Sequence, residues 1–345
     1  MRTTFQKRLV FLILLGLLLF PALAGSGCAA GDSEKDQYKI HTEMVFLENG
    51  RGSYTLAEFA VPENDMPGVK GQPAAAEGQP AAAKGQPAAA EGQPAGARTG
   101  GCPMVAVAHG FTGTMDSGGA AELIRRLAAA GIAAVRVDFD SYLTPEKNDD
   151  PTNRACEYTL RDMEDDLTLA LQYACNHYRI DENRLGVYGR SMGGRVAMMM
   201  ANESYGGFEY QAMALVAPAG NDRAMIYFMG GQRHWEEMKS QADEDGYVQY
   251  KQLRLRPDWF TQFEDYDPCA HGDSFGDKPV LVICNTLDHV VTDETSRQCA
   301  AAYENSRVIE VTTADGHGYE MSRKDSDLKN MLMDEIVAHF AKKLS

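Results

Sequence analysis

The sequence predicts an α/β protein with a mostly parallel, doubly wound sheet and helices on both of its faces. Short apolar runs of the kind found in buried parallel strands alternate with amphipathic segments along most of the chain. The length of 345 residues suits one large domain with attachments, and a hydrophobic content of 44% is ordinary for a chain that buries a core. The formal charge of −16 repels phosphate backbones, which argues against a nucleic-acid partner.

The alternation of predicted strands and helices begins after residue 101. The predicted strands are 105–108, 133–137, 185–188, 212–216, 280–284 and 308–311. The predicted helices are 120–130, 160–178, 193–201, 294–303 and 328–343. Before them, two stretches rich in β-branched and aromatic residues, 40–46 and 54–61, flank a glycine-containing turn. This arrangement predicts an antiparallel hairpin at the start of the domain.

Two segments interrupt the predicted domain, which spans 37–345. Residues 63–101 contain a seven-residue repeat, first complete at 71–77, with regular Gly and Pro and almost no bulky apolar residue. Such a composition cannot form a core, so we interpret it as a flexible surface insertion. Residues 221–263 are rich in Trp, Tyr, Met, Arg and Glu and fit no strand of the sheet, which predicts an inserted lid.

The first 28 residues have the layout of an export signal. Basic residues precede an apolar run at 9–20, which is too short for a typical membrane-spanning helix, and small residues follow it. Cys28 closes a stretch that resembles a bacterial lipoprotein cleavage box, although Gly25 stands where Leu is usual. Residues 29–36 would then form a solvated tether. We predict an exported, membrane-anchored lipoprotein facing outward, with plain secretion after cleavage near Ala24 as the alternative.

The strongest chemical signal is the sequence Gly-Arg-Ser-Met-Gly-Gly at 189–194. It follows a predicted strand and precedes a predicted helix, which is the context of a nucleophile elbow. In such a turn the serine hydroxyl projects at the carboxyl end of the sheet, beside the positive end of a helix dipole. Ser191 is therefore the predicted nucleophile.

The loop at 109–113 follows the first strand of the alternating region, where this architecture completes an oxyanion hole. We expect the backbone N–H groups of Phe111 and Met192 to face the developing oxyanion together. His109 is interpreted as a structural residue that holds this turn, because the base of a triad in this architecture follows the acid along the chain.

The remaining triad members are expected in the loops after the last two strands. Asp288 follows the strand 280–284 and is the predicted acid, and His317 follows the strand 308–311 and is the predicted base. Asp315 is the alternative acid. His289 neighbours the acid but is interpreted as a loop residue.

The cysteines give no indication of a metal centre. After Cys28, six more are scattered without a Cys-x-x-Cys pair or a histidine at zinc-ligand spacing. Some of them can pair as disulfides outside the cytoplasm. We therefore predict no metal and no organic cofactor.

Taken together, the His-Gly-Phe-Thr-Gly loop, the elbow, the loop of Asp288 and the Asp-Gly-His-Gly-Tyr segment of His317 resemble the esterase and serine-aminopeptidase-like branch of the α/β-hydrolase superfamily. Within that branch the sequence is most similar to bacterial cinnamoyl or feruloyl esterases. The resemblance covers residues 37 to 345 apart from the insertion. It implies that the lid roofs the substrate pocket with aromatic side chains, from Tyr227, Phe228, Trp235, Trp259 and Phe260. These aromatics could equally form the lid's own core.

The sequence therefore predicts a serine hydrolase that cleaves carboxylic esters, of small molecules or linked to polysaccharide, through an acyl-enzyme. Two alternatives stay open. A peptidase or amidase would use the same triad, and a surface lipoprotein that kept the fold would act as a non-catalytic binding module. Membrane contact is expected only through the lipid anchor.

Overall fold

A computed structural model describes residues 38–66, 81–83, 100–148, 150–154 and 157–345. The predicted signal segment, Cys28 and the tether lie outside these residues, as does most of the predicted insertion, so those predictions stay untested. Residues 81–83 of the insertion pair with the edge of the sheet as a short strand.

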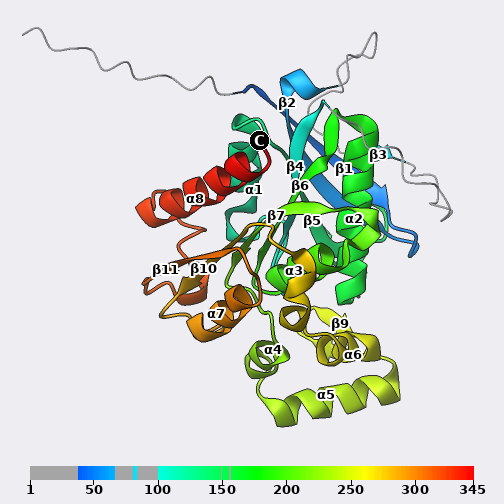
Figure 1. Ribbon diagram of the computed structural model, residues 1–345. Coiled ribbons are helices and arrows are strands. Elements are labelled where there is room, and N and C mark those ends of the chain that lie inside the picture. The colour runs from blue at the N-terminus through cyan, green and yellow to red at the C-terminus, as the bar shows by residue number, and fades with distance from the viewer. Residues whose placement is uncertain (1–37, 67–80, 84–99, 149, 155–156) are drawn as a thin grey trace, which may run out of the picture. The chain divides into compact units, whose positions relative to one another are not determined.

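The described residues contain a nine-stranded sheet in the order β11-β10-β7-β6-β4-β5-β2-β1-β3 (Figure 1). Its strands are β1 Ile40–Glu48, β2 Tyr54–Pro62, β3 Ala81–Ala83, β4 Cys102–Ala108, β5 Ala133–Tyr142, β6 Ile180–Arg190, β7 Tyr210–Val216, β10 Val280–Asn285 and β11 Ser306–Val311. From β5 to β11 all neighbours are parallel, whereas β1 and β2 form an antiparallel hairpin that adds to β5. The predicted parallel sheet and opening hairpin are both confirmed.

Helices cover both faces of this sheet. They are α1 Ala120–Ala129, α2 Leu160–His177, α3 Met192–Glu203, α7 Asp293–Ala301 and α8 Asp327–Lys343. One buried apolar cluster joins α2 and α3 to the sheet, and a second joins α1 and α8 to it (Figure 1). Three of these helices, α2, α7 and α8, begin at a side-chain cap. For α2, the side chains and backbone N–H groups of Thr159 and Asp162 satisfy each other in a capping box. None of the helices in the described part of the chain is long and apolar enough to cross a membrane.

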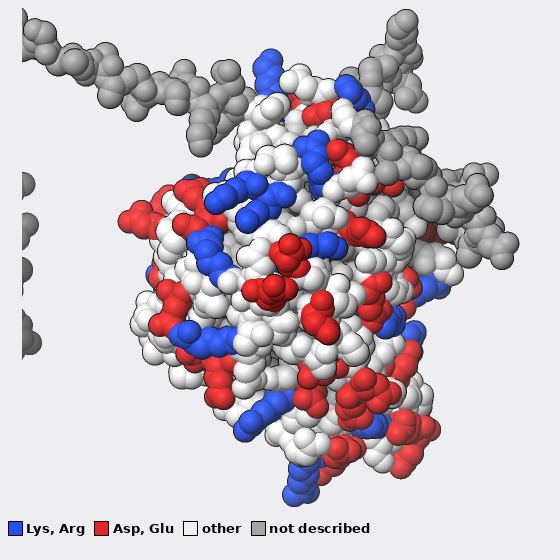
Figure 2. Space-filling model, viewed as in Figure 1, with Lys and Arg blue, Asp and Glu red and all other residues white. Residues whose placement is uncertain are grey.

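The predicted lid segment, 221–263, contributes no strand to the main sheet. It contains α4 Asp222–Phe228, α5 Gln232–Asp245, a separate hairpin of β8 Val248–Tyr250 and β9 Leu253–Leu255, and the start of α6 Pro257–Asp265. These elements lie together below the main sheet in Figure 1. Exposed acidic side chains gather on this side of the molecule, as Figure 2 shows, and α5 supplies several of them, including Glu236, Glu237 and Asp243.

A buried arginine holds the two ends of the lid segment. Arg195 of α3 is fully buried and donates hydrogen bonds to the carbonyl of Gly220 at 3.3 Å, before the lid, and to that of Phe263 at 2.8 Å, at its end. It also donates to the carbonyls of Ala219 and Tyr266. Because a buried guanidinium needs such acceptors, both ends of the lid are tied to the helix that follows Ser191.

Residue His339 makes stability depend on pH. Its side chain is buried on α8, and that burial, with the nearby cations Arg307 and Lys343, lowers the pKa of His339 to about 4. Between this value and the ordinary pKa of about 6.5, the unfolded chain binds a proton that the folded chain does not. This contribution to stability is complete above pH 6.5 and is lost as the pH falls toward 4.

We therefore expect the free energy of unfolding to fall by about 2 kcal/mol more in the wild type than in His339→Gln when the pH is lowered from 7 to 5. Urea unfolding at the two pH values measures this difference. An equal fall in both proteins would show that the pKa of His339 is the same in the folded and the unfolded chain.

Candidate active site

The turn between β6 and α3 is the sharp elbow that the sequence predicts. Ser191 stands between the last residue of β6 and the first of α3, with a φ of 57° in the left-handed region. A Cβ added at Gly189 would lie 2.1 Å from the carbonyl oxygen of Gly193, and one added at Gly193 would lie 2.3 Å from that of Ala108. Only glycine fits at these two positions, and the strained turn exposes the serine at the edge of the sheet.

The structure brings Asp288 and His317 into direct contact. The Nδ1 atom of His317 lies 2.7 Å from Oδ2 of Asp288. The other carboxylate oxygen of Asp288 accepts hydrogen bonds from the N–H groups of Val290 at 2.8 Å and Val291 at 3.0 Å. Asp288 is only 3% exposed, so these partners hold one orientation. The carboxylate therefore keeps the proton of His317 on Nδ1 and leaves Nε2 as the proton acceptor.

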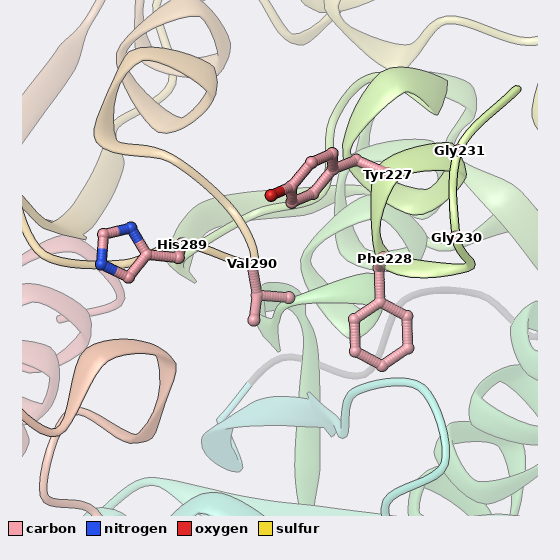
Figure 3. Close-up of a pocket in the computed structure, with 6 residues that line it drawn as sticks. All are labelled: Tyr227, Phe228, Gly230, Gly231, His289 and Val290. Carbon is pink, nitrogen blue, oxygen red and sulfur yellow. The ribbon is translucent and has the colours of Figure 1, made fainter.

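Ser191 and His317 line the same cavity, which has a volume of about 230 Å³. The other lining side chains are apolar apart from Thr112, and they include Phe111, Met225, Phe228 and Val291. A second, more open groove of about 450 Å³ shares Phe228 and Val290 with this cavity. Figure 3 shows the loop that carries His289 and Val290 facing the end of α4, which carries Tyr227 and Phe228. We call these two spaces the inner cavity and the outer groove.

The loop after β4 lies directly against Ser191. A Cβ added at Gly110 would come within 3.1 Å of the Ser191 Cβ, which places the next residue, Phe111, beside the serine. Met192 is the first residue of α3, so its N–H has no acceptor within the helix. Phe111 and Met192 thus both adjoin Ser191, one next to Gly110 in the loop after β4 and one as the following residue in the chain.

His109 is a structural residue. It is buried, its Nδ1 lies 2.8 Å from the carbonyl oxygen of Gly110, and its Nε2 accepts a hydrogen bond from the N–H of Phe139 at 3.2 Å. These two contacts require a neutral ring with the proton on Nδ1. His109 therefore fixes the loop that carries Phe111, as the sequence indicates.

The other two candidates from these loops, Asp315 and His289, stand apart from the contact between Asp288 and His317. Asp315 turns toward its own loop, where Oδ2 accepts the N–H of Glu320 at 2.7 Å. His289 is exposed and lines the outer groove. Neither occupies the place that Asp288 has beside His317.

The lid aromatics divide into two groups, which corrects part of the prediction. Trp235 is fully buried inside the lid, where it packs edge-on against Phe260 and its indole N–H donates to Glu264 at 2.8 Å. This burial arises because the apolar faces of α5 and α6 cover each other, so Trp235 and Phe260 form lid core and do not line the inner cavity or the outer groove. Trp259 is also buried, and it reaches the site only by stacking on Phe111 at 5.1 Å. Phe228 lines both spaces, and Tyr227, 70% exposed, lines the outer groove.

Sequence reasoning missed Asn285, which connects the acid loop to the base loop. Its amide donates to the carbonyls of Thr313 at 3.0 Å and Gly316 at 2.8 Å, and its oxygen accepts the N–H groups of Thr313 and Leu287. The side chain is fully buried. The signal in the sequence that could have pointed to Asn285 was a polar residue at the end of an apolar strand. A second residue also binds this loop: the side chain of Arg190 donates a hydrogen bond to the carbonyl of His317. Asn285 and Arg190 thus hold the loop that carries His317.

Replacing Asn285 by alanine should lower kcat about tenfold to a hundredfold with little change in KM, because the loop of His317 loses its link to the loop of Asp288. Ester kinetics measure this, with urea unfolding alongside. Asn202→Ala is the matched control: Asn202 is also buried and bonds Pro268 and Tyr303, away from the triad. It should lose stability and keep kcat. Equal kcat losses in both variants would show that the lower kcat of Asn285→Ala results from a general loss of stability.

A family model described as an α/β-hydrolase domain matches residues 101–219, which include the loop of Phe111 and the elbow of Ser191. The chain has the α/β-hydrolase fold. Est1E from Butyrivibrio proteoclasticus matches with 16% sequence identity over 88% of this chain and 99% of that chain, at a TM-score of 0.57. Its structure with ferulic acid bound gives 16% identity over 87% and 99%, at a TM-score of 0.58.

Other solved structures of α/β hydrolases show the same likeness. A carboxylesterase cloned from a metagenomic library, EstE1, is 16% identical over 90% of this chain and 91% of its own, with a TM-score of 0.52. A dienelactone hydrolase from Anabaena variabilis is 13% identical over 89% and 99%, with a TM-score of 0.50. A comparison with curated protein sequences gives no match. Identities this low establish the α/β-hydrolase fold alone.

Proposed function

We propose that this α/β hydrolase cleaves carboxylic esters through an acyl-enzyme formed on Ser191. The observation that carries the proposal is the 2.7 Å contact of His317 with Asp288 at a cavity that Ser191 also lines. His317 takes the serine proton through Nε2 as the hydroxyl attacks the ester carbonyl, and the alcohol leaves with that proton. Water activated by the same nitrogen then releases the acid. The N–H groups of Phe111 and Met192 stabilise the oxyanion in both steps.

The shape of the site supports a substrate with two parts. At about 230 Å³, the inner cavity lies below the roughly 300–1,000 Å³ of pockets for drug-sized ligands, and its wall is almost entirely apolar. It suits a short acyl chain or a single aromatic ring. The outer groove, with Tyr227 and His289 at its rim, has room for the rest of the ester. A polar alcohol, small or attached to a polysaccharide, fits this more open space.

The lining also favours an ester over an aminoacyl amide. An aminopeptidase needs a carboxylate to hold the substrate ammonium group. Among the described residues that line the inner cavity and the outer groove, none is Asp or Glu. The acidic side chains of α5 that Figure 2 shows lie on the lid surface instead.

The proposal is tested with a panel of p-nitrophenyl acetate and butyrate, methyl ferulate and leucine p-nitroanilide, together with a fluorophosphonate probe. Ester turnover with the probe attached to Ser191 is the expected result, and the preferred ester reports which group enters the inner cavity. Faster release of nitroaniline than of ester products would identify an amidase. No labelling and no turnover would favour the non-catalytic binding module.

A further inference from the structure

Two cysteines from separate elements of the fold meet beside Gly220, the residue that precedes the lid. Cys269 lies in the short helical segment Pro268–Phe275 that follows the lid, and Cys299 lies on α7. Their sulfur atoms are 3.5 Å apart, although 30 positions separate the residues in sequence. We propose that Cys269 and Cys299 form a disulfide that ties the base of the lid to α7.

The surrounding backbone is shaped around both sulfur atoms. A Cβ added at Gly220 would lie 2.2 Å from the sulfur of Cys299 and 2.9 Å from that of Cys269. Any larger residue would displace one sulfur or the other, so the glycine keeps the space that the pair occupies. A disulfide bond needs the sulfurs to approach by about another 1.5 Å, which is a small side-chain adjustment.

The two thiols differ in the way that disulfide exchange requires. Cys299 is fully buried, whereas Cys269 is partly exposed and can be reached by an external oxidant. The hydrogen bond between them lowers the pKa of Cys269, and the guanidinium of Arg195 lowers it further. The same hydrogen bond and burial raise the pKa of Cys299. Cys269 is therefore the thiol that reacts first.

The reaction needs an external disulfide, either a small molecule such as oxidised glutathione or an oxidised dithiol protein. The thiolate of Cys269 attacks one sulfur of that disulfide, which breaks the S–S bond and releases the first thiol. Cys299 then attacks the sulfur of Cys269, and the second thiol leaves. Two protein thiols are oxidised, one external disulfide is reduced to two thiols, and the two cysteine protons pass to those products.

The bond would reinforce a junction that Arg195 already makes. Gly220 directly precedes the lid, and Cys269 follows its last helix, so both ends of the lid meet at the cysteine pair. Arg195 binds carbonyls on both ends from α3. The disulfide would add α7, whose chain follows directly from the loop of Asp288. Oxidation would thus fix the lid base relative to the acid loop.

The test uses the full-length protein incubated with oxidised or with reduced glutathione, then treated with N-ethylmaleimide and digested without reduction. Mass spectrometry should find a peptide pair joined through Cys269 and Cys299 in the oxidised sample. In Cys299→Ser, a glutathione adduct should accumulate on Cys269, because the resolving thiol is missing.

Thermal unfolding gives a second readout. Oxidation should raise the melting temperature of the wild type by about 5 °C, from the closure of a loop of this length. The rise in melting temperature on oxidation should vanish in Cys269→Ser. It should persist in Cys284→Ala, which removes a buried cysteine of β10. Three results would each overturn the proposal. The first is labelling of both Cys269 and Cys299 by N-ethylmaleimide after oxidation, and the second is a disulfide from either of them to a different cysteine. The third is a rise in melting temperature on oxidation that survives in Cys269→Ser.

Discussion

Replacing Ser191 by alanine should lower kcat on the preferred ester about 10⁴-fold or more and leave the fold intact. The change removes the attacking oxygen, and what remains is the smaller acceleration from the oxyanion hole and from binding. Alanine also keeps the Cβ of serine, so the left-handed turn at φ 57° is no more strained than before. Ester kinetics measure the loss, and circular dichroism checks the fold.

The chain offers a closely matched control for this variant. Ser204, at the other end of α3, is also a serine in the left-handed region, with a φ of 49°. Ser204→Ala removes the same hydroxyl from another serine with a positive φ and should retain wild-type kcat. If Ser191→Ala kept more than about a tenth of the activity, a different nucleophile or a contaminating esterase would have to be responsible.

The sheet could be predicted from sequence because its strands are locally distinctive. The run at 280–284, for example, is apolar at every position, and in β10 all six residues are buried. The elbow was predictable for the same reason: its glycines, strand and helix are adjacent in sequence. The predicted ends were less accurate. The strand predicted at 133–137 continues to Tyr142 in β5, because pairing with β2 extends it through polar residues.

The lid and the loop contacts could not be predicted because they depend on packing between distant segments. Trp235 and Phe228 are both aromatic residues in the lid, yet one is buried core and the other lines the cavity. Composition alone does not distinguish them, because the difference is set by how α5 and α6 pack. Asn285 likewise has a meaning only when β10 and β11 are neighbours, which brings its amide to the loop of His317.

Asp288→Asn should lower kcat by about 10³-fold to 10⁴-fold with little change in KM. The N–H groups of Val290 and Val291 require an oxygen at the inner position, so the new amide nitrogen must face His317. That nitrogen donates, which forces Nδ1 to accept and moves the imidazole proton to Nε2. His317 then has no lone pair directed at Ser191, and the loss arises from the wrong tautomer alone.

The control is Asp315→Asn, on the same loop as His317. It should keep kcat, because the Asp315 carboxylate turns to Glu320. A larger loss in Asp315→Asn than in Asp288→Asn would transfer the role of the acid to Asp315.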